Sequence, residues 1–268
     1  WQMAYLLMTY FGQQGRREAQ KLLERNAQDG DRLLGAFNRP MPHWLDFFCY
    51  TMFVDRDGKF QLGMLSTSAF KPLAASMGPM LKEESFHLGT GSNGLRRIIK
   101  AGVIPLDMLQ RYINKWVATA HDLFGVDASS SAHWAYVWGI KGRWDERKKL
   151  DAGIEVDKEI LNEESRGHYH DEIVGEVKKL CGYLPEGSTQ LYVPHENFNR
   201  DIGATKGQNF YVDGTIFERS DDDYAEYLTT VLPTPQDEID LKELFKQEWI
   251  ANKPMSTRQI DSGIGASA

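Results

Sequence analysis

The sequence predicts an all-α fold, a helical bundle followed by a less regular C-terminal half. Two observations indicate this fold. Apolar residues recur every three to four positions through most of the first 124 residues, as on the buried face of a helix. Only one short segment, 209–217, alternates with the period of a strand. The 268 residues are enough for one large domain with a real core, and 41% hydrophobic and 26% charged residues are typical of a globular chain.

The composition excludes several classes of protein. A net charge of −7 argues against a dedicated nucleic-acid binder, which needs a basic face. The longest apolar run, 47–54, is far shorter than the ~20 residues that span a bilayer, so no membrane partner is expected. The two cysteines, one of them inside this run, argue against a disulfide framework. Together with the absence of a signal-peptide pattern, they predict a cytoplasmic protein.

Proline and glycine residues mark where the predicted helices begin, bend and end. Pro42 suits the first turn of one helix, Gly78-Pro79 predicts a kink or a late start in the next, and Gly125 suits a helix stop. Further on, Asp213-Gly214 predicts a small hairpin. The apolar stripes predict helices over 1–12, 15–26, 42–64, 72–100, 105–124, 173–181 and 237–250, with a polar tail over the last twelve residues. We interpret 1–127 as the bundle part and 128–268 as a mixed, loop-rich extension packed on the same domain.

Glu84 and His87 form an E-x-x-H motif on the predicted helix 72–100. Three residues apart on a helix, both side chains project to one side and can serve the same metal. They also continue the apolar stripe of Met77 and Met80, and a buried carboxylate needs a partner or a metal. The alternative is a surface Glu beside a hydrogen-bonded His, because such a motif also arises by chance.

Asp55 ends the apolar run of the preceding helix and shares a face with Phe48 and Met52. Two neighbouring antiparallel helices would therefore offer one carboxylate and one E-x-x-H. A four-helix carboxylate bundle takes two of each, so this chain holds half of such a site. The alternative for Asp55 is a helix-terminal residue beside Arg56.

Four segments carry a resemblance to a known family: WQMAYLLMTYFG, GRREAQKLLERN, FVDRDGKFQL and LKEESFHLG, in this order and spacing. They resemble the family of the benzoyl-CoA 2,3-epoxidase oxygenase component (benzoyl-CoA oxygenase component B), a ferritin-like class I di-iron family. The phenylacetyl-CoA epoxidase catalytic subunit is a more distant relative. The resemblance is tightest over 1–100 and continues more loosely to about residue 215.

The resemblance implies that Asp55, Glu84 and His87 are the metal ligands of the family's second helix pair. The first carboxylate and the first E-x-x-H would lie upstream of Trp1, so we interpret the chain as N-terminally truncated and expect it to be inactive alone. The implied cofactor is a pair of non-haem iron ions.

The implied activity is insertion of one oxygen atom of O2 into the aromatic ring of an aroyl-CoA thioester during aerobic aromatic degradation. The implied partners are that substrate, a separate NADPH-dependent reductase and a possible second copy in a homodimer. A separate reductase is expected because no flavin, nicotinamide or Fe–S motif is visible. The alternatives are a phenylacetyl-CoA epoxidase-like subunit, or a metal-free scaffold or CoA-thioester-binding subunit with a degenerate bundle.

Three further patterns invite a functional interpretation. Arg96, Arg97 and Lys100 could bind the phosphates of coenzyme A, the alternative being a solvated helix face. The G-x-G-x-x-G run at 89–94 lacks the preceding strand of a dinucleotide site, so we expect close helix packing or a bend instead. His168 and His170 form an H-x-H pair that could bind a metal, but the flanking residues favour a solvated loop.

Overall fold

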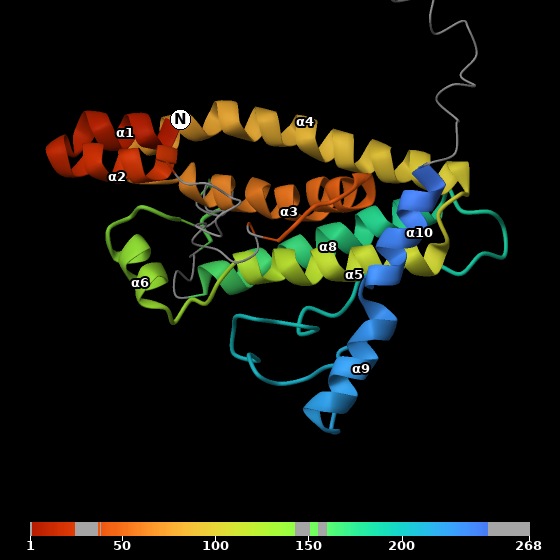
Figure 1. The fold of residues 1–268 in the computed structure, drawn as a ribbon. Helices are drawn as coiled ribbons and strands as arrows, with labels where there is room; N and C mark the ends of the chain where they lie inside the picture. Colours follow the sequence, from red (N-terminus) through yellow and green to blue (C-terminus); the bar gives the residue numbers. More distant parts are fainter. Residues whose placement is uncertain (1, 25–36, 38, 143–150, 155–159, 246–268) are drawn as a thin grey trace, which may run out of the picture. The chain divides into compact units, whose positions relative to one another are not determined.

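The computed structural model describes residues 2–24, 37, 39–142, 151–154 and 160–245. In these residues every regular element is a helix, which confirms the all-α prediction (Figure 1). The contacts divide the chain into two compact units, Trp1–Leu232 and Pro233–Ala268. The helices of the first unit are α1 (Gln2–Tyr10), α2 (Gly12–Glu24), α3 (Trp44–Leu65), α4 (Lys71–Ala101), α5 (Leu106–Leu123), α6 (Ser130–Val137), α8 (Leu161–Cys181) and α9 (Asp221–Val231).

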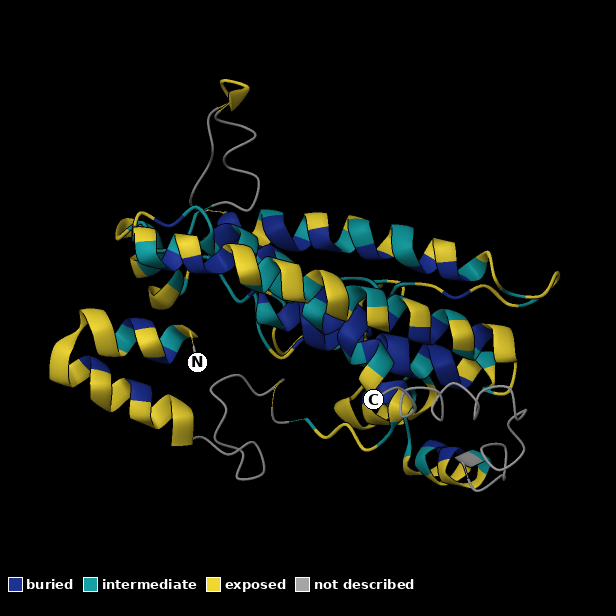
Figure 2. Cartoon of the chain, turned by 90° about the horizontal axis from the view of Figure 1, so that it is seen from above, coloured by how far each residue is buried: buried dark blue, intermediate teal, exposed yellow. Residues whose placement is uncertain are grey.

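Helix α3 is the centre of the first unit, because it contacts α4, α5 and α8. Its Met52 and Phe53 are fully buried, and so is Trp116 of α5. Figure 2 shows the buried residues gathered on the inner faces of these helices and the exposed residues on their outer faces. Apolar side chains of α3 and of its neighbouring helices are therefore removed from water together, which stabilises the position of α3.

Helix α4 starts at Lys71 and runs without interruption through Gly78 and Pro79. The predicted late start is therefore wrong. Leu73 and Met77, in the first two turns, are buried in a cluster with Leu6 and Leu62, and this packing holds the turns that precede the proline. Gly102, with φ +64°, ends the helix in the left-handed conformation that glycine adopts without strain.

Helices α3 and α4 lie antiparallel and unusually close. A Cβ atom at Gly91 would lie 2.5 Å from the backbone nitrogen of Met52, and one at Gly94 would lie 2.2 Å from Cδ1 of Phe48. A side chain at either position would have to push the helices apart. Two glycines of the run, Gly91 and Gly94, therefore serve close helix packing, which is one of the two roles expected for it.

Helix α8 corrects the sequence interpretation of its first half. The segment 166–172, expected as a loop, is helical, and α8 starts at Leu161 rather than near 173. Its buried face continues N-terminally through Ser165 and Tyr169, both with no exposed surface. Because serine and tyrosine carry hydroxyl groups, the sequence pattern did not show that these two positions belong to the buried face of the helix.

The remaining segments agree with the prediction in part. The hairpin consists of a single antiparallel bridge between Phe210 and Ile216, with Gly214 at φ +87° in the turn. In the second unit, α10 covers Pro235–Phe245, and the rest of the predicted helix and the tail lie outside the described residues. No helix in the described part of the chain is both long and apolar enough to cross a bilayer. The division at residue 127 stays a prediction.

Candidate metal centre

Asp55, Glu84 and His87 come together at the contact between α3 and α4. Each offers one ligand atom, and these three atoms lie within 4.8 Å of one another. Nδ1 of His87 is 3.6 Å from Oδ2 of Asp55 and 3.4 Å from Oε2 of Glu84. Ligands of one metal ion, each about 2.0–2.2 Å from it, are separated by comparable distances. The geometry therefore suits one shared ion.

The antiparallel packing of α3 and α4 explains why these residues meet. Asp55 lies one turn of α3 beyond Met52, and His87 lies one turn of α4 before Gly91, so the close contact of Met52 with Gly91 brings the two side chains together. Asp55 is in the interior of α3, which continues to Leu65. The helix-terminal alternative for Asp55 is therefore wrong.

The electrostatics of the two carboxyl groups are unusual for residues on a helix surface. Burial, reinforced by the negative charge of Glu84, raises the pKa of Asp55 to about 7. Burial also raises the pKa of Glu84, although the neighbouring His87 acts in the opposite direction. The nearby cations Arg56 and Lys59 pair with Glu172 of α8 instead. Among the described residues, the two carboxyl groups thus share a site without a Lys or Arg partner.

One atom of this group is suited to a cation. Oε2 of Glu84 is buried and makes no directed hydrogen bond in the described residues, and its contact with Nδ1 of His87, 3.4 Å away, is electrostatic. A buried carboxylate oxygen without a partner is costly, and a bound cation would remove that cost. His87 is half-exposed, with 52% of its side chain accessible, so the group has an open side. Two carboxylates and one imidazole with open positions fit a non-haem iron ion.

A buried polar network next to this group was not predicted from the sequence. Asp57 of α3 is buried, accepts a hydrogen bond from Nε2 of Gln61 at 3.1 Å, and has a pKa raised by burial to about 7. Nζ of Lys141 donates to Gln61 at 2.9 Å and to Asn162 of α8 at 2.6 Å. The four-residue spacing of Asp57 and Gln61 is the only trace of this network in the sequence.

The predicted H-x-H pair does not form a site of its own. On helix α8, residues two apart point in different directions, and His168 is exposed while His170 turns inward. His170 instead meets His121 of α5, with Nδ1 and Nε2 3.3 Å apart. Burial lowers the pKa of both imidazoles below their ordinary value. This pairing joins residues 49 positions apart, which single-sequence patterns do not indicate.

The three basic residues predicted to bind substrate lie elsewhere on α4. Arg96, Arg97 and Lys100 are in its last turns, and nine or more residues separate them from His87, about 13 Å along the helix. Lys100 Nζ and Arg96 Cζ lie 4.8 and 5.8 Å from the ring centroid of Tyr183. The structure does not bring them to the carboxylates, and their role in binding coenzyme A stays a prediction.

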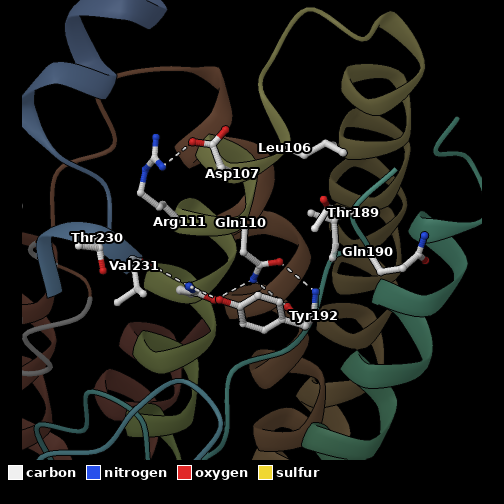
Figure 3. A pocket seen from close by; sticks show the side chains of 11 residues that line it. Leu106, Asp107, Gln110, Arg111, Thr189, Gln190, Tyr192, Thr230 and Val231 are labelled. Carbon is white, nitrogen blue, oxygen red and sulfur yellow. Dashed lines mark hydrogen bonds and ion pairs between the residues drawn. The ribbon is translucent and has the colours of Figure 1, made fainter. Parts of the chain in front are cut away.

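A cleft of about 540 Å³ also opens between α5, the segment 189–192 and the end of α9 (Figure 3). Its floor is made by the buried amides of Gln110 and Asn114. Gln110 exchanges two hydrogen bonds with the backbone of Tyr192, and Asn114 donates to the carbonyl of Val231 at 2.9 Å. These amides hold the walls of the cleft together, and none of the predicted site residues lines it.

With this geometry established, residues 2–196 match the phenylacetic acid catabolic protein family. The chain belongs to this family. The matched region contains α1 to α8 and all three residues of the candidate metal centre, and the family fold is a ferritin-like helical bundle. The resemblance noted in the sequence is thereby confirmed.

A curated relative extends the comparison. The chain is 34% identical over 289 aligned positions to benzoyl-CoA oxygenase component B of Aromatoleum evansii. The alignment covers 91% of this chain and 60% of the relative, so the chain spans about 60% of the length of that protein.

Proposed function

We propose that this chain is part of an oxygenase subunit that inserts one oxygen atom of O2 into the aromatic ring of an aroyl-CoA thioester. The observation that carries the proposal is the group of Asp55, Glu84 and His87, whose ligand atoms lie within 4.8 Å of one another. The buried Oε2 of Glu84, which makes no hydrogen bond in the described residues, supports a cation at this point. The family match and the name of the curated relative support the reaction class.

The proposed cofactor is a pair of non-haem iron ions, which would pass electrons from the reductase to O2. Asp55, Glu84 and His87 are the share of the ligands that this group contributes. A ferritin-like site takes a second carboxylate and a second E-x-x-H. Among the described residues no other metal-ligating group of this size occurs. Because the chain spans only 60% of the length of the relative, the proposal takes the remaining ligands from the part of the oxygenase that this chain does not include.

The residues of the group have distinct tasks in this proposal. Asp55 and Glu84 provide anionic oxygen ligands, and because the pKa of Asp55 is about 7, metal binding below that pH must displace its proton. His87 provides a neutral nitrogen and borders the open side, through which substrate and O2 can approach. Arg96, Arg97 and Lys100 are proposed to bind the phosphates of the CoA moiety.

The electrons are proposed to come from a separate NADPH-dependent reductase. The relative is called component B, which supports an enzyme of several components. We propose a cytoplasmic location for the complex.

Phenylacetyl-CoA is the second candidate substrate, because the matched family is described by phenylacetic acid catabolism. Oxygenation assays of the complete oxygenase with benzoyl-CoA and phenylacetyl-CoA, supplied with its reductase, distinguish the two. Faster ring oxygenation of benzoyl-CoA is expected, and a preference for phenylacetyl-CoA would reassign the substrate.

Anaerobic Fe(II) titration of the 268-residue chain tests the metal centre. We expect at most one iron per chain, bound weakly, and its loss in Glu84→Ala and His87→Ala. Glu83→Ala is the matched control, because Glu83 is an exposed neighbour outside the group. Unchanged iron binding in both ligand variants would refute the assignment of these residues as ligands. Two tightly bound irons per chain would contradict the half-site.

A further inference from the structure

Gly58 lies on the face of α3 that contacts α4, one turn beyond Asp55. It is the position of α3 that faces Glu84. A Cβ atom at position 58 would lie 3.2 Å from Oε1, 3.4 Å from Cδ and 3.8 Å from Oε2 of Glu84. All three atoms of the carboxyl group therefore lie against the backbone of α3 at the point where any other residue carries a side chain.

This contact differs from those of the other glycines between α3 and α4. Gly91 faces the backbone of Met52, and Gly94 faces the ring of Phe48, so both permit the helices to approach. Within 4 Å, the three nearest atoms to a Cβ at Gly58 all belong to the Glu84 carboxyl group. The space left by Gly58 is thus occupied by a candidate ligand rather than by the neighbouring helix.

We propose that Gly58 is a positioning residue for the metal centre, because its missing side chain leaves the space that the Glu84 carboxylate occupies. The inference rests on the proposed metal site. Alanine is preferred to glycine in a helix interior, so the local helix propensity does not account for a glycine here. With alanine, the carboxylate would have to move by a few tenths of an ångström, which is a large part of the about 0.5 Å within which a ligand must be placed.

The first test compares two glycine-to-alanine variants in anaerobic Fe(II) titrations of the 268-residue chain. Gly58→Ala is expected to weaken iron binding roughly tenfold, as for other changes that disturb the orientation of a ligand. Gly89→Ala is the matched control, because it lies in α4 with no atom within 4 Å of an added Cβ. Iron binding in this control is expected to stay at the wild-type level. Equal affinities of the two variants would overturn the inference.

A double-mutant cycle keeps the test decisive if Gly58→Ala also perturbs the fold. Glu84→Asp shortens the ligand by one methylene and draws its carboxylate away from position 58. The roughly tenfold loss caused by Gly58→Ala should then largely disappear in the Glu84→Asp background, whereas a general folding defect would persist in both. Additive losses would overturn the role of Gly58.

Comparison with the ligand variants distinguishes the failure of this inference from the failure of the proposed function. If Glu84→Ala and His87→Ala bind iron like the wild type, the metal centre itself is refuted and the inference falls with it. If those two variants lose iron but Gly58→Ala matches Gly89→Ala, only the role of Gly58 is refuted. Circular dichroism of each variant without metal reports the helical content, which is expected to be unchanged.

Discussion

Two regions of this chain bury carboxyl groups in opposite ways. Asp122, near the end of α5, is ion-paired with Arg200 and accepts hydrogen bonds from the backbone N–H groups of Asp201 and Ile202. Asp55 and Glu84 are partly buried as well, yet they face each other and a half-exposed His87, with no Lys or Arg partner in the part of the chain that the structure describes. The first arrangement is electrostatically complete, and the second leaves an anionic site open for a cation.

Asp46 supports this comparison from within α3 itself. Its carboxylate accepts hydrogen bonds from Nζ of Lys115 at 2.6 Å and from Nε1 of Trp116 at 2.9 Å. Asp46 and Asp55 thus lie on one helix, nine residues apart, with different partners. Burial alone therefore does not identify the role of a carboxylate. A buried carboxylate that is paired with a cation has a structural role, whereas one that lacks such a pair can serve as a metal ligand.

The largest effect is expected when the buried ion pair of Asp122 and Arg200 is broken. Asp122→Ala leaves the buried guanidinium of Arg200 without its counter-ion, and removing one partner of a buried ion pair costs about 3–5 kcal/mol. We expect a loss of that size in the free energy of unfolding, measured by urea denaturation. Asp55→Ala, made in the same way, should cost much less without metal, since among the described residues Asp55 is paired only with the half-exposed His87 and with no buried Lys or Arg. Equal losses would erase the distinction between the two regions.

The next effect concerns the pH dependence of metal binding. The pKa of Asp55 is about 7, so below that pH a metal must displace its proton. Fe(II) affinity of the chain should therefore fall by up to about tenfold per pH unit below pH 7 for each proton displaced and level off above it. Anaerobic titrations between pH 5.5 and 8, with Asp55→Asn as the control that removes this proton, measure the slope. A flat profile in the wild type would contradict metal binding at Asp55.

A smaller effect is expected on the stability of the metal-free chain. The folded pKa of Asp55 lies above its ordinary value of 3.8, so the folded state binds more protons than the unfolded state between about pH 4 and pH 7. Stability contributed by this group is present below that window and is lost as the pH rises through it. Urea unfolding in the presence of EDTA should show the decline. Asp55→Asn should reduce the decline but not abolish it, because Asp57 behaves alike.

The smallest effect has the opposite sign and comes from the imidazole pair. Burial lowers the pKa values of His121 and His170 below 6.5, so the unfolded state binds more protons just below that pH. The contribution of this pair to stability should therefore fall as the pH decreases below about 6.5, which opposes the contribution of Asp55 and Asp57. His170→Gln should weaken this acid sensitivity, so the pH dependence of its unfolding midpoint should differ from that of the wild type. Identical pH dependences of the two proteins would show that the pair does not titrate as inferred.

The meeting of α3 with α4 could be predicted from the sequence because one physical rule governs it. Asp55 shares the apolar stripe of Phe48 and Met52, and Glu84 continues that of Met77, so burying both stripes brings these two carboxyl groups together. The same rule failed for the first half of α8, where Ser165 and Tyr169 occupy buried positions that a search for apolar residues overlooks.

Other features depend on contacts between distant segments. His121 meets His170, and Lys100 meets the ring of Tyr183, only because helices far apart in the sequence lie side by side. Periodicity within one segment carries no information on such pairs. For the same reason, the sequence identified Arg96 and Lys100 as a basic cluster but did not indicate that an aromatic ring lies beneath them.

The glycines at 91 and 94 have a mechanical consequence for the candidate metal centre. They form recesses on α4 that receive the Met52 backbone and the Phe48 ring, and these contacts fix the register of the two helices. Sliding α4 along α3 by even one residue, about 1.5 Å, would drive side chains into the space that only glycine leaves free. The alignment of Asp55 with His87 is therefore fixed by helix contacts that lie one to two turns away from the candidate ligands. A change in what these ligands bind does not alter those contacts.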